Sequence, residues 1–196
     1  MSRVIVHESR HDELVERAEK IAKSLSVSPG IERTEFGANM GAMVSDGQRD
    51  RALGMISRAE EQGARVAAGG RKPNRPGAFL EPTVLSGVTP DMDIAQQEVF
   101  GPVLSVLSFR EDAQAIKIAN GTDYGLVAGV FTADLDRATR AARQLRAGQV
   151  FVNKWYAGGV ETPFGGYGKS GYGREKGREA LWNYVQTKNI AIRLKG

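Results

Sequence analysis

Apolar strand-type segments alternate with longer amphipathic segments along almost the whole chain, and glycine, proline or asparagine separates them. This alternation is typical of a parallel sheet that helices bury on both faces. Strands are expected at 3–7, 64–68, 78–85, 103–107, 126–131, 149–153 and 188–194. Helices are expected from a cap at Ser9 to Leu25 and at 45–62, 91–97, 112–119, 134–145 and 177–184. The sequence therefore predicts an α/β fold, a parallel sheet with helices on both faces.

The composition excludes several classes of protein. The 196 residues contain no cysteine, which excludes a disulfide scaffold, a cysteine-ligated zinc and a thiol nucleophile within the sequence. The formal charge of +4 is small and its acidic and basic residues are interspersed, so neither nucleic acid nor a membrane is expected as a partner. No apolar run approaches the length of a membrane span, and no apolar signal segment follows Arg3. A cytoplasmic protein is expected.

The segment 97–103, which reads QEVFGPV, joins the helix expected at 91–97 to the strand expected at 103–107. Gly101 permits a sharp turn or a close approach, and Pro102 prevents the helix from continuing. Glu98 and Phe100 lie beside this break. The residues alone leave two interpretations open. One is a plain connection with an exposed acid and a core aromatic, and the other is a ligand-facing corner at the end of a sheet.

The segment 7–11 reads HESRH and matches the zinc-protease pattern H-E-x-x-H. That chemistry needs both imidazoles on one face of one helix. His7 is expected to end a strand, and Ser9 with Asp12 is expected to form a capping box, so the helix starts between the two histidines. No metal site is predicted.

The segment 166–171 reads GYGKSG and matches two phosphate-binding patterns. A Rossmann fingerprint must leave a strand directly and have an acid about twenty residues on, and neither condition is met. A P-loop needs glycine where this sequence has Pro163. No phosphate site is predicted here.

A succession of segments favours the ligand-facing interpretation of the corner. It reads EVFGPV at 98–103, ANGTDYGL at 119–126, AGVFT at 128–132, AGQVFVN at 147–153 and PFGGYGKSGYGRE at 163–175. In this order and spacing the segments closely resemble the C-terminal half of the NAD(P)-dependent aldehyde dehydrogenase superfamily. The resemblance implies part of that family's catalytic domain at 1–187 and a strand of its oligomerisation region at 188–196.

The resemblance also implies a cofactor, NAD or NADP, and the residues that hold it. In the family, the acid of this corner holds the hydroxyl groups of the nicotinamide ribose and the aromatic packs near the same ring, which here means Glu98 and Phe100. Gln48 and Arg51 match residues that reach the adenosine ribose. The chemistry is consistent, because a carboxylate accepts two hydroxyl hydrogens and a glutamine offers a donor and an acceptor.

The implied substrate of the complete enzyme is a small aldehyde. Phe164 resembles the aromatic wall of the family's aldehyde tunnel. The loop 154–161 is where such enzymes vary to choose their substrate, so Trp155 and Tyr156 are expected to line the substrate site.

The sequence departs from the family pattern in two places. The segment 40–45 reads MGAMVS where the family often has MGPLVS. In the family, Ser2 and Arg3 would end the segment whose cysteine attacks the aldehyde. That cysteine, the general-base glutamate, the oxyanion-holding asparagine and the dinucleotide-binding half all come earlier. No catalytic residue is therefore expected here, and the isolated chain is expected to be inactive.

Three hypotheses remain open. The first is the C-terminal part of an aldehyde dehydrogenase, truncated or completed by another chain, that oxidises an aldehyde to a carboxylate with NAD or NADP. Its expected partners are further copies of itself in a homo-oligomer or a chain that carries the missing N-terminal half. The second is a non-enzymatic module that docks onto full-length dehydrogenase subunits. The third is an independent enzyme with another nucleophile.

Overall fold

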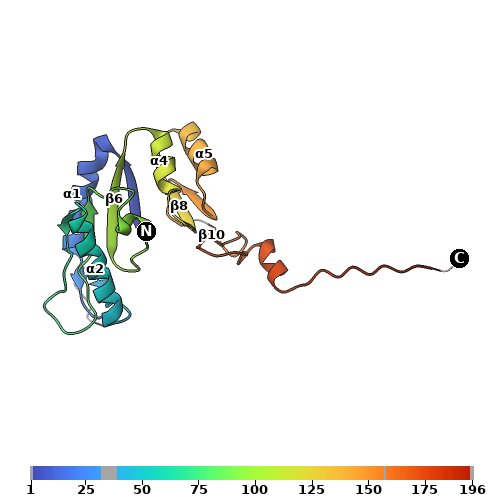
Figure 1. Ribbon diagram of the computed structural model, residues 1–196, viewed down its shortest axis with the longest axis horizontal. Coiled ribbons are helices and arrows are strands. Elements are labelled where there is room, and N and C mark those ends of the chain that lie inside the picture. The colour runs from blue at the N-terminus through green and yellow to red at the C-terminus, as the bar shows by residue number, and fades with distance from the viewer. Residues whose placement is uncertain (1, 32–38, 157, 195–196) are drawn as a thin grey trace. The chain divides into compact units, whose positions relative to one another are not determined.

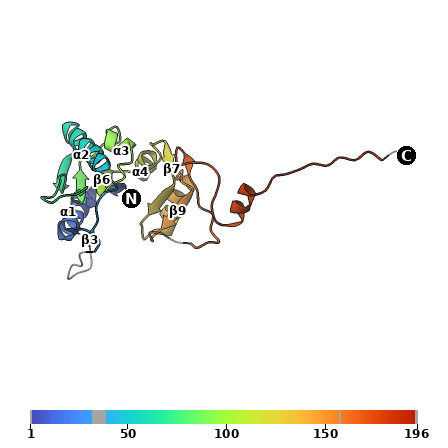
Figure 2. The same ribbon diagram turned by 90° about the horizontal axis from the view of Figure 1, so that it is seen from below.

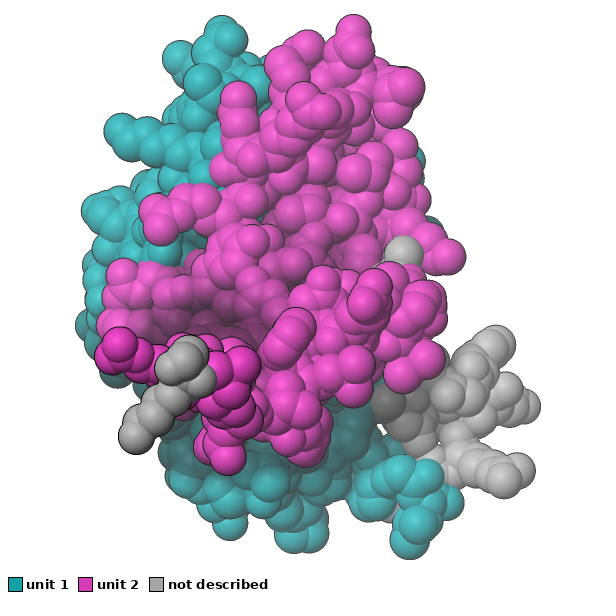
Figure 3. All heavy atoms as spheres, turned by 90° about the vertical axis from the view of Figure 1, so that its right-hand side faces the viewer, with its two compact units in different colours: residues 1–122 teal, residues 123–196 magenta. Residues whose placement is uncertain are grey.

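The computed structural model describes residues 2–31, 39–156 and 158–194. The chain divides into two compact units, residues 1–122 and 123–196 (Figure 1, Figure 3). The sequence patterns do not predict a division at this place, because strands and helices alternate on both sides of it. The boundary expected between 187 and 188 stays a prediction.

The first unit contains a four-stranded sheet in the order β1-β6-β5-β4. Its strands are β1 (Arg3–His7), β6 (Val103–Phe109), β5 (Thr83–Ser86) and β4 (Arg65–Ala68). β1, β6 and β5 run parallel, whereas β4 is antiparallel to β5. The predicted parallel sheet is therefore mostly parallel, with β4 as the antiparallel strand at its edge. A parallel neighbour needs a crossover, usually a helix, and residues 69–82 between β4 and β5 form none.

Helices cover both faces of this sheet, as the sequence predicts. They are α1 (Glu8–Ser24), α2 (Asp46–Glu61), α3 (Asp93–Gln96) and α4 (Asp112–Ala119). Neighbouring residues of one strand belong to different cores, since Val84 clusters with Val15 of α1 and Leu85 clusters with Met55 of α2. Figure 2 shows α1 and α2 on opposite sides of β6. Because successive side chains of a strand point to opposite faces, β5 contributes to two separate apolar layers.

The Arg3 side chain, at the start of β1, hydrogen-bonds to the C-terminal end of α4. The Arg3 guanidinium donates to the carbonyls of Ile118 at 3.2 Å and Ala119 at 3.0 Å. These are C-terminal helix carbonyls that have no partner within the helix. Burial lowers the pKa of Arg3 from its ordinary value.

Two details of the first unit differ from the sequence expectation. The helix begins at Glu8, and its N-cap is His7, whose ring accepts from the Ser9 backbone N–H at 3.2 Å. Ser9 is therefore not the cap, although the helix does start between the two histidines. β2 (Ser26–Val27) pairs with β3 (Asn39–Met40), where no strand is predicted, and residues 32–38 between them lie outside the described residues.

The second unit is built on two strand pairs. β8 (Val127–Val130) and β9 (Gln149–Val152) run parallel, and α5 (Leu135–Gln144) is the crossover between them. β7 (Tyr124–Gly125) pairs antiparallel with β10 (Tyr167–Gly168). A short 3₁₀ helix, η1 (Arg178–Asn183), stands where a longer α-helix is predicted.

The strand expected at 188–194 is not formed. Residues 185–194 have neither helical nor strand structure. An extended segment becomes a strand only where another edge accepts its hydrogen bonds, and no described strand pairs with it. The side chains of Ile190, Ile192 and Leu194 are 72%, 78% and 84% exposed.

Membrane-spanning helices and metal-binding clusters are both absent from the described residues. No helix there is long and apolar enough to cross a membrane. The same residues contain no group of three or more His, Asp or Glu side chains placed to hold a metal ion.

Candidate functional site

The corner at 97–102 connects α3 to β6 and is anchored in the core by one residue. Val99 is 3% exposed, whereas the flanking Glu98 and Phe100 are exposed. Phe100 has φ +55°, in the left-handed region that side chains other than glycine rarely adopt. Its ring is 71% exposed, so the interpretation of Phe100 as a core residue is wrong. The corner presents an acid and an aromatic to solvent through a strained backbone.

Side chains near the N-terminal end of α2 hydrogen-bond to the corner. Ser45 caps α2 by accepting the Gln48 backbone N–H at 3.1 Å. The Gln48 side-chain Nε2 donates to the carbonyls of Val99 at 3.1 Å and Phe100 at 3.2 Å. The Arg51 guanidinium donates to the Val99 carbonyl at 3.4 Å. The structure thus brings together Gln48 and Arg51 with the segment that carries Glu98 and Phe100.

Ser2 also reaches this corner. Its hydroxyl lies 3.5 Å from the Glu98 carboxylate, and its carbonyl accepts from the Ser105 backbone N–H at 3.0 Å. Because β1 and β6 are parallel with Arg3 opposite Ser105, the segments before both strands meet at one edge of the sheet. Sequence reasoning missed this contact, since it joins residues 96 positions apart.

Gly101 lies against Met43, and its backbone is not in the left-handed region. A Cβ there would lie 3.0 Å from the Met43 methyl carbon. The Met43 backbone N–H is itself fixed by the Ala78 carbonyl at 2.7 Å. The segment before α2 therefore lies against the corner, and a side chain at position 101 would require the flexible end of Met43 to shift.

The predicted substrate residues all lie in the second unit. Phe164 exchanges two backbone hydrogen bonds of 2.7 Å with Glu175, and the Lys176 ammonium lies 5.8 Å from the Phe164 ring centre. Tyr156 and Phe164 contribute to a shallow pocket of about 230 Å³. Its other lining residues are Gln149, Gly158, Thr162, Glu175 and Lys176.

Trp155 is placed differently. Its ring meets the ring of buried Phe151 edge-on, with centroids 6.1 Å apart, and is 48% exposed. Trp155 also covers Gly129, where a Cβ would lie 3.0 Å from the indole. The structure therefore brings Tyr156 and Phe164 to one pocket and leaves Trp155 outside its lining.

Known proteins with the same pattern identify the family. The model of the aldehyde dehydrogenase family matches residues 1–190. The chain belongs to the aldehyde dehydrogenase family. An aldehyde dehydrogenase of Emericella nidulans is 42% identical over 193 residues, which are 98% of this chain and 38% of that protein. A betaine aldehyde dehydrogenase of Brucella anthropi is 40% identical over 98% of this chain and 40% of its own length.

Solved structures of the family agree with this fold. The NAD+ complex of aldehyde dehydrogenase from Bacillus cereus has a TM-score of 0.91 and 39% identity, and the match covers 99% of this chain and 39% of that chain. The chain thus spans about two-fifths of the length of the relatives it matches. The predicted family and α/β fold are confirmed. The alternative of a non-enzymatic docking module finds no support.

Proposed function

We propose that this chain forms the part of an NAD- or NADP-dependent aldehyde dehydrogenase that holds the nicotinamide ribose and supplies aromatic surface to the aldehyde site. The proposal rests on one observation. Gln48 and Arg51 of α2 converge on the carbonyls of the corner that exposes Glu98 and Phe100. The complete enzyme would oxidise an aldehyde to a carboxylate.

The residues at and beside the corner fit the riboses of the cofactor, with Glu98 and Phe100 at the nicotinamide ribose. Its two hydroxyls need acceptors, and Glu98 is an exposed carboxylate whose hydrogen bond to the Ser2 hydroxyl is long at 3.5 Å. Gln48, which the resemblance matches to the adenosine ribose, donates its Nε2 to backbone carbonyls of the corner, so its Oε1 is the atom suited to accept a hydroxyl proton of that ribose. Phe100 offers an exposed aromatic surface beside the acid. Structures of relatives from Bacillus cereus and Mycobacterium tuberculosis contain NAD+, which supports this choice of ligand.

The chain's own residues would bind and orient. A bound nicotinamide would supply the hydride acceptor of the oxidation. Glu98 would fix the ribose by accepting its hydroxyl hydrogens, and Phe100 would cover one side of the same part of the ligand. Tyr156 and Phe164 would pack against the aldehyde. The 196 residues contain no cysteine, so the nucleophile would come from residues outside them.

We also propose a homo-oligomer in the cytoplasm as the working form, with a chain that carries the rest of the enzyme as the alternative partner. Exposed apolar residues of the segment 185–194 support association. One curated relative, from Mus musculus, is named a cytosolic aldehyde dehydrogenase and is 40% identical over 193 residues.

A chimaeric enzyme tests the proposal. Residues 1–190 of this chain would replace the matching segment of the Bacillus cereus enzyme. The chimaera should oxidise a simple aldehyde with NAD, and Glu98→Gln should raise its KM for NAD about ten-fold, because one charged acceptor is lost. Glu61→Gln, an exposed acid at the end of α2, is the matched control and should leave this KM unchanged. A folded, active chimaera whose KM for NAD does not change on Glu98→Gln would refute the proposed role.

A further inference from the structure

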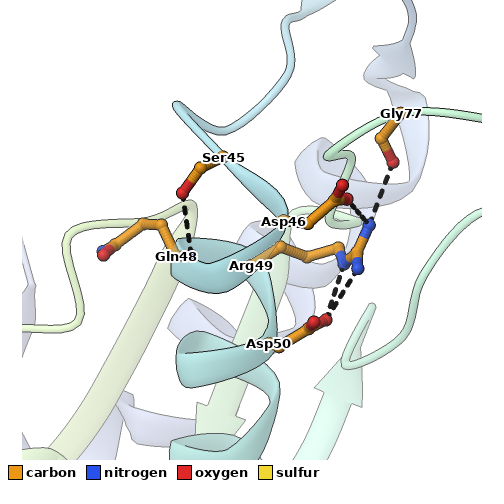
Figure 4. A network of polar contacts seen from close by, with 6 residues as sticks. All are labelled: Ser45, Asp46, Gln48, Arg49, Asp50 and Gly77. Carbon is orange, nitrogen blue, oxygen red and sulfur yellow. Dashed lines mark hydrogen bonds and ion pairs between the residues drawn. The ribbon is translucent and has the colours of Figure 1, made fainter.

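Arg49 lies in the sequence between Gln48 and Arg51, two of the residues predicted to contact a ribose, and its side chain is buried. Its side chain is only 8% exposed, although it lies on the first turn of a surface helix. Figure 4 shows its guanidinium directed at Asp46, Asp50 and the Gly77 carbonyl, while Gln48 points to the other side of the helix. Buried charged side chains persist only where they are paired and hydrogen-bonded.

The contacts of Arg49 involve all three nitrogens of its guanidinium group. Nε donates to Asp50 at 2.9 Å, and Nη2 lies 2.8 Å from the same carboxylate. Nη1 donates to the Gly77 carbonyl at 3.1 Å and also contacts Asp46. Two of these partners lie on the helix, and the third lies on the separate segment that connects β4 to β5.

Helix stability does not explain this arrangement. A cation in the first turn of a helix opposes the helix dipole, which favours acids at that end. Asp46 and Asp50 are 70% and 62% exposed, and ion pairs with exposed partners contribute little to stability. The contact that remains to be explained is the one that joins α2 to the Gly77 carbonyl.

The contact between Arg49 and Gly77 is linked to the corner through Met43. After Gly77, the Ala78 carbonyl accepts the Met43 backbone N–H at 2.7 Å, and Met43 packs against Gly101. α2 also contacts the corner directly, because Gln48 donates to the carbonyls of Val99 and Phe100. Arg49 thus joins α2, which contacts the corner through Gln48, to the segment 77–78, which hydrogen-bonds Met43 beside the corner.

We propose that Arg49 is a positioning residue for the corner. By joining α2 to the Gly77 carbonyl, it fixes Gln48 and Met43 against residues 99–101 and so holds Phe100 in its left-handed conformation beside Glu98. The inference rests on the proposed function for the identity of the ligand, but not for the geometry that Arg49 maintains.

The test is hydrogen exchange of the whole 196-residue chain, followed by mass spectrometry. Arg49→Met should raise exchange about ten-fold in peptides that cover 98–102, where the clamp is lost, and leave peptides from β6 unchanged. Arg58→Met is the matched control, because Arg58 lies on the same helix in an exposed pair with Asp93. Arg49→Lys, which keeps the charge but lacks the fork, should restore part of the protection.

Two outcomes would overturn the inference. One is unchanged exchange at 98–102 in a folded Arg49→Met chain, and the other is an equal rise throughout the first unit, which would indicate a general stabilising role. If Arg49→Met does not fold, Asp50→Asn weakens the same clamp by charge alone. It should raise exchange at 98–102 selectively, and a uniform rise would again refute the role.

A parallel NAD titration separates this inference from the proposed function. If the wild-type chain shows no NAD-dependent change at the corner while Arg49→Met still loosens it, the proposed function fails and the positioning role stands. If NAD changes the corner equally in wild-type and Arg49→Met chains, the positioning role fails and the proposed function stands.

Discussion

Gly69 and Gly87 show how the surroundings of a single residue decide what it tolerates. Both have left-handed backbones, with φ +70° and +68°. A Cβ on Gly69 would lie 2.2 Å from the Pro82 carbonyl oxygen, whereas a Cβ on Gly87 would meet nothing within 4 Å. Gly87→Ala should therefore cost only the left-handed backbone term, about 1–2 kcal/mol.

Gly69→Ala should cost at least about 2 kcal/mol more than Gly87→Ala, because the backbone of Pro82 cannot move aside without disturbing β5. Urea unfolding of both variants, with equal slopes against denaturant, measures the difference. Equal costs for the two substitutions would show that the close approach at Gly69 does not exist.

At this scale, the sequence predicts contiguous features well and distant contacts poorly. Glu98 and Phe100 could be placed beside a turn because the segment 97–103 carries them together with the glycine and proline that form it, while their roles at a ribose come from the resemblance and stay a prediction. Ser2 and Arg49 could not be named. Ser2 meets Glu98 only because β1 pairs with β6, and Arg49 reaches Gly77 across 28 positions of sequence.

Among the elements, α2 depends on its N-terminal cap. Ser45 accepts the Gln48 backbone N–H, so Ser45→Ala should reduce the free energy of unfolding by about 1 kcal/mol. Ser57→Ala in the middle of the same helix is the control and should be neutral or slightly stabilising, since alanine is the better helix former. Chemical denaturation compares the two, and the role of the cap is refuted if they behave alike.

The turn after β10 contains an exposed ion pair whose strength depends on pH. The Lys169 ammonium lies 2.7 Å from Asp123, and this hydrogen bond lowers the pKa of Asp123 and raises the pKa of Lys169. The contribution of Asp123 is present above its ordinary pKa of about 4 and is lost as pH falls through the lowered value. The contribution of Lys169 is present below about pH 10 and is lost as pH rises through its raised pKa.

Unfolding measured from pH 7 down to pH 2 tests this ion pair. Lys169→Met should remove part of the loss of stability on acidification, whereas Lys72→Met, an exposed lysine of the first unit, should not. The pair has no such role if both variants retain the wild-type acid dependence. Both groups of the pair are exposed, so the effect should be small and should shrink in high salt.

Element prediction succeeded where the pattern was local. The helix at 112–119 coincides with α4, and the strand at 3–7 coincides with β1. The strand expected at 78–85 begins only at Thr83, because Pro82 has no N–H to donate to a ladder. The antiparallel direction of β4 and the missing strand at 188–194 depend on which partner an edge finds, and that information is not local.

For the whole molecule, the segment 185–194 is the feature most open to association. It exposes Val185, Ile190, Ile192 and Leu194 without strand pairing among the described residues. An unpaired apolar segment can add to another sheet edge. Deletion of residues 188–196 should therefore reduce self-association of the chain in light scattering. A monomer with the segment intact, or an unchanged oligomer without it, would contradict this role.

The most direct test of the ribose site is a titration of the ¹⁵N-labelled chain with NAD, followed by NMR. The Gln48 side-chain amide and the backbone signals of 98–101 should shift together, with a dissociation constant of about millimolar, because these residues supply only the ribose contacts. Glu98→Gln should weaken the shifts, and Glu61→Gln should leave them unchanged. Shifts confined to other residues, or micromolar binding that does not depend on Glu98, would contradict the assignment of the corner as the ribose site.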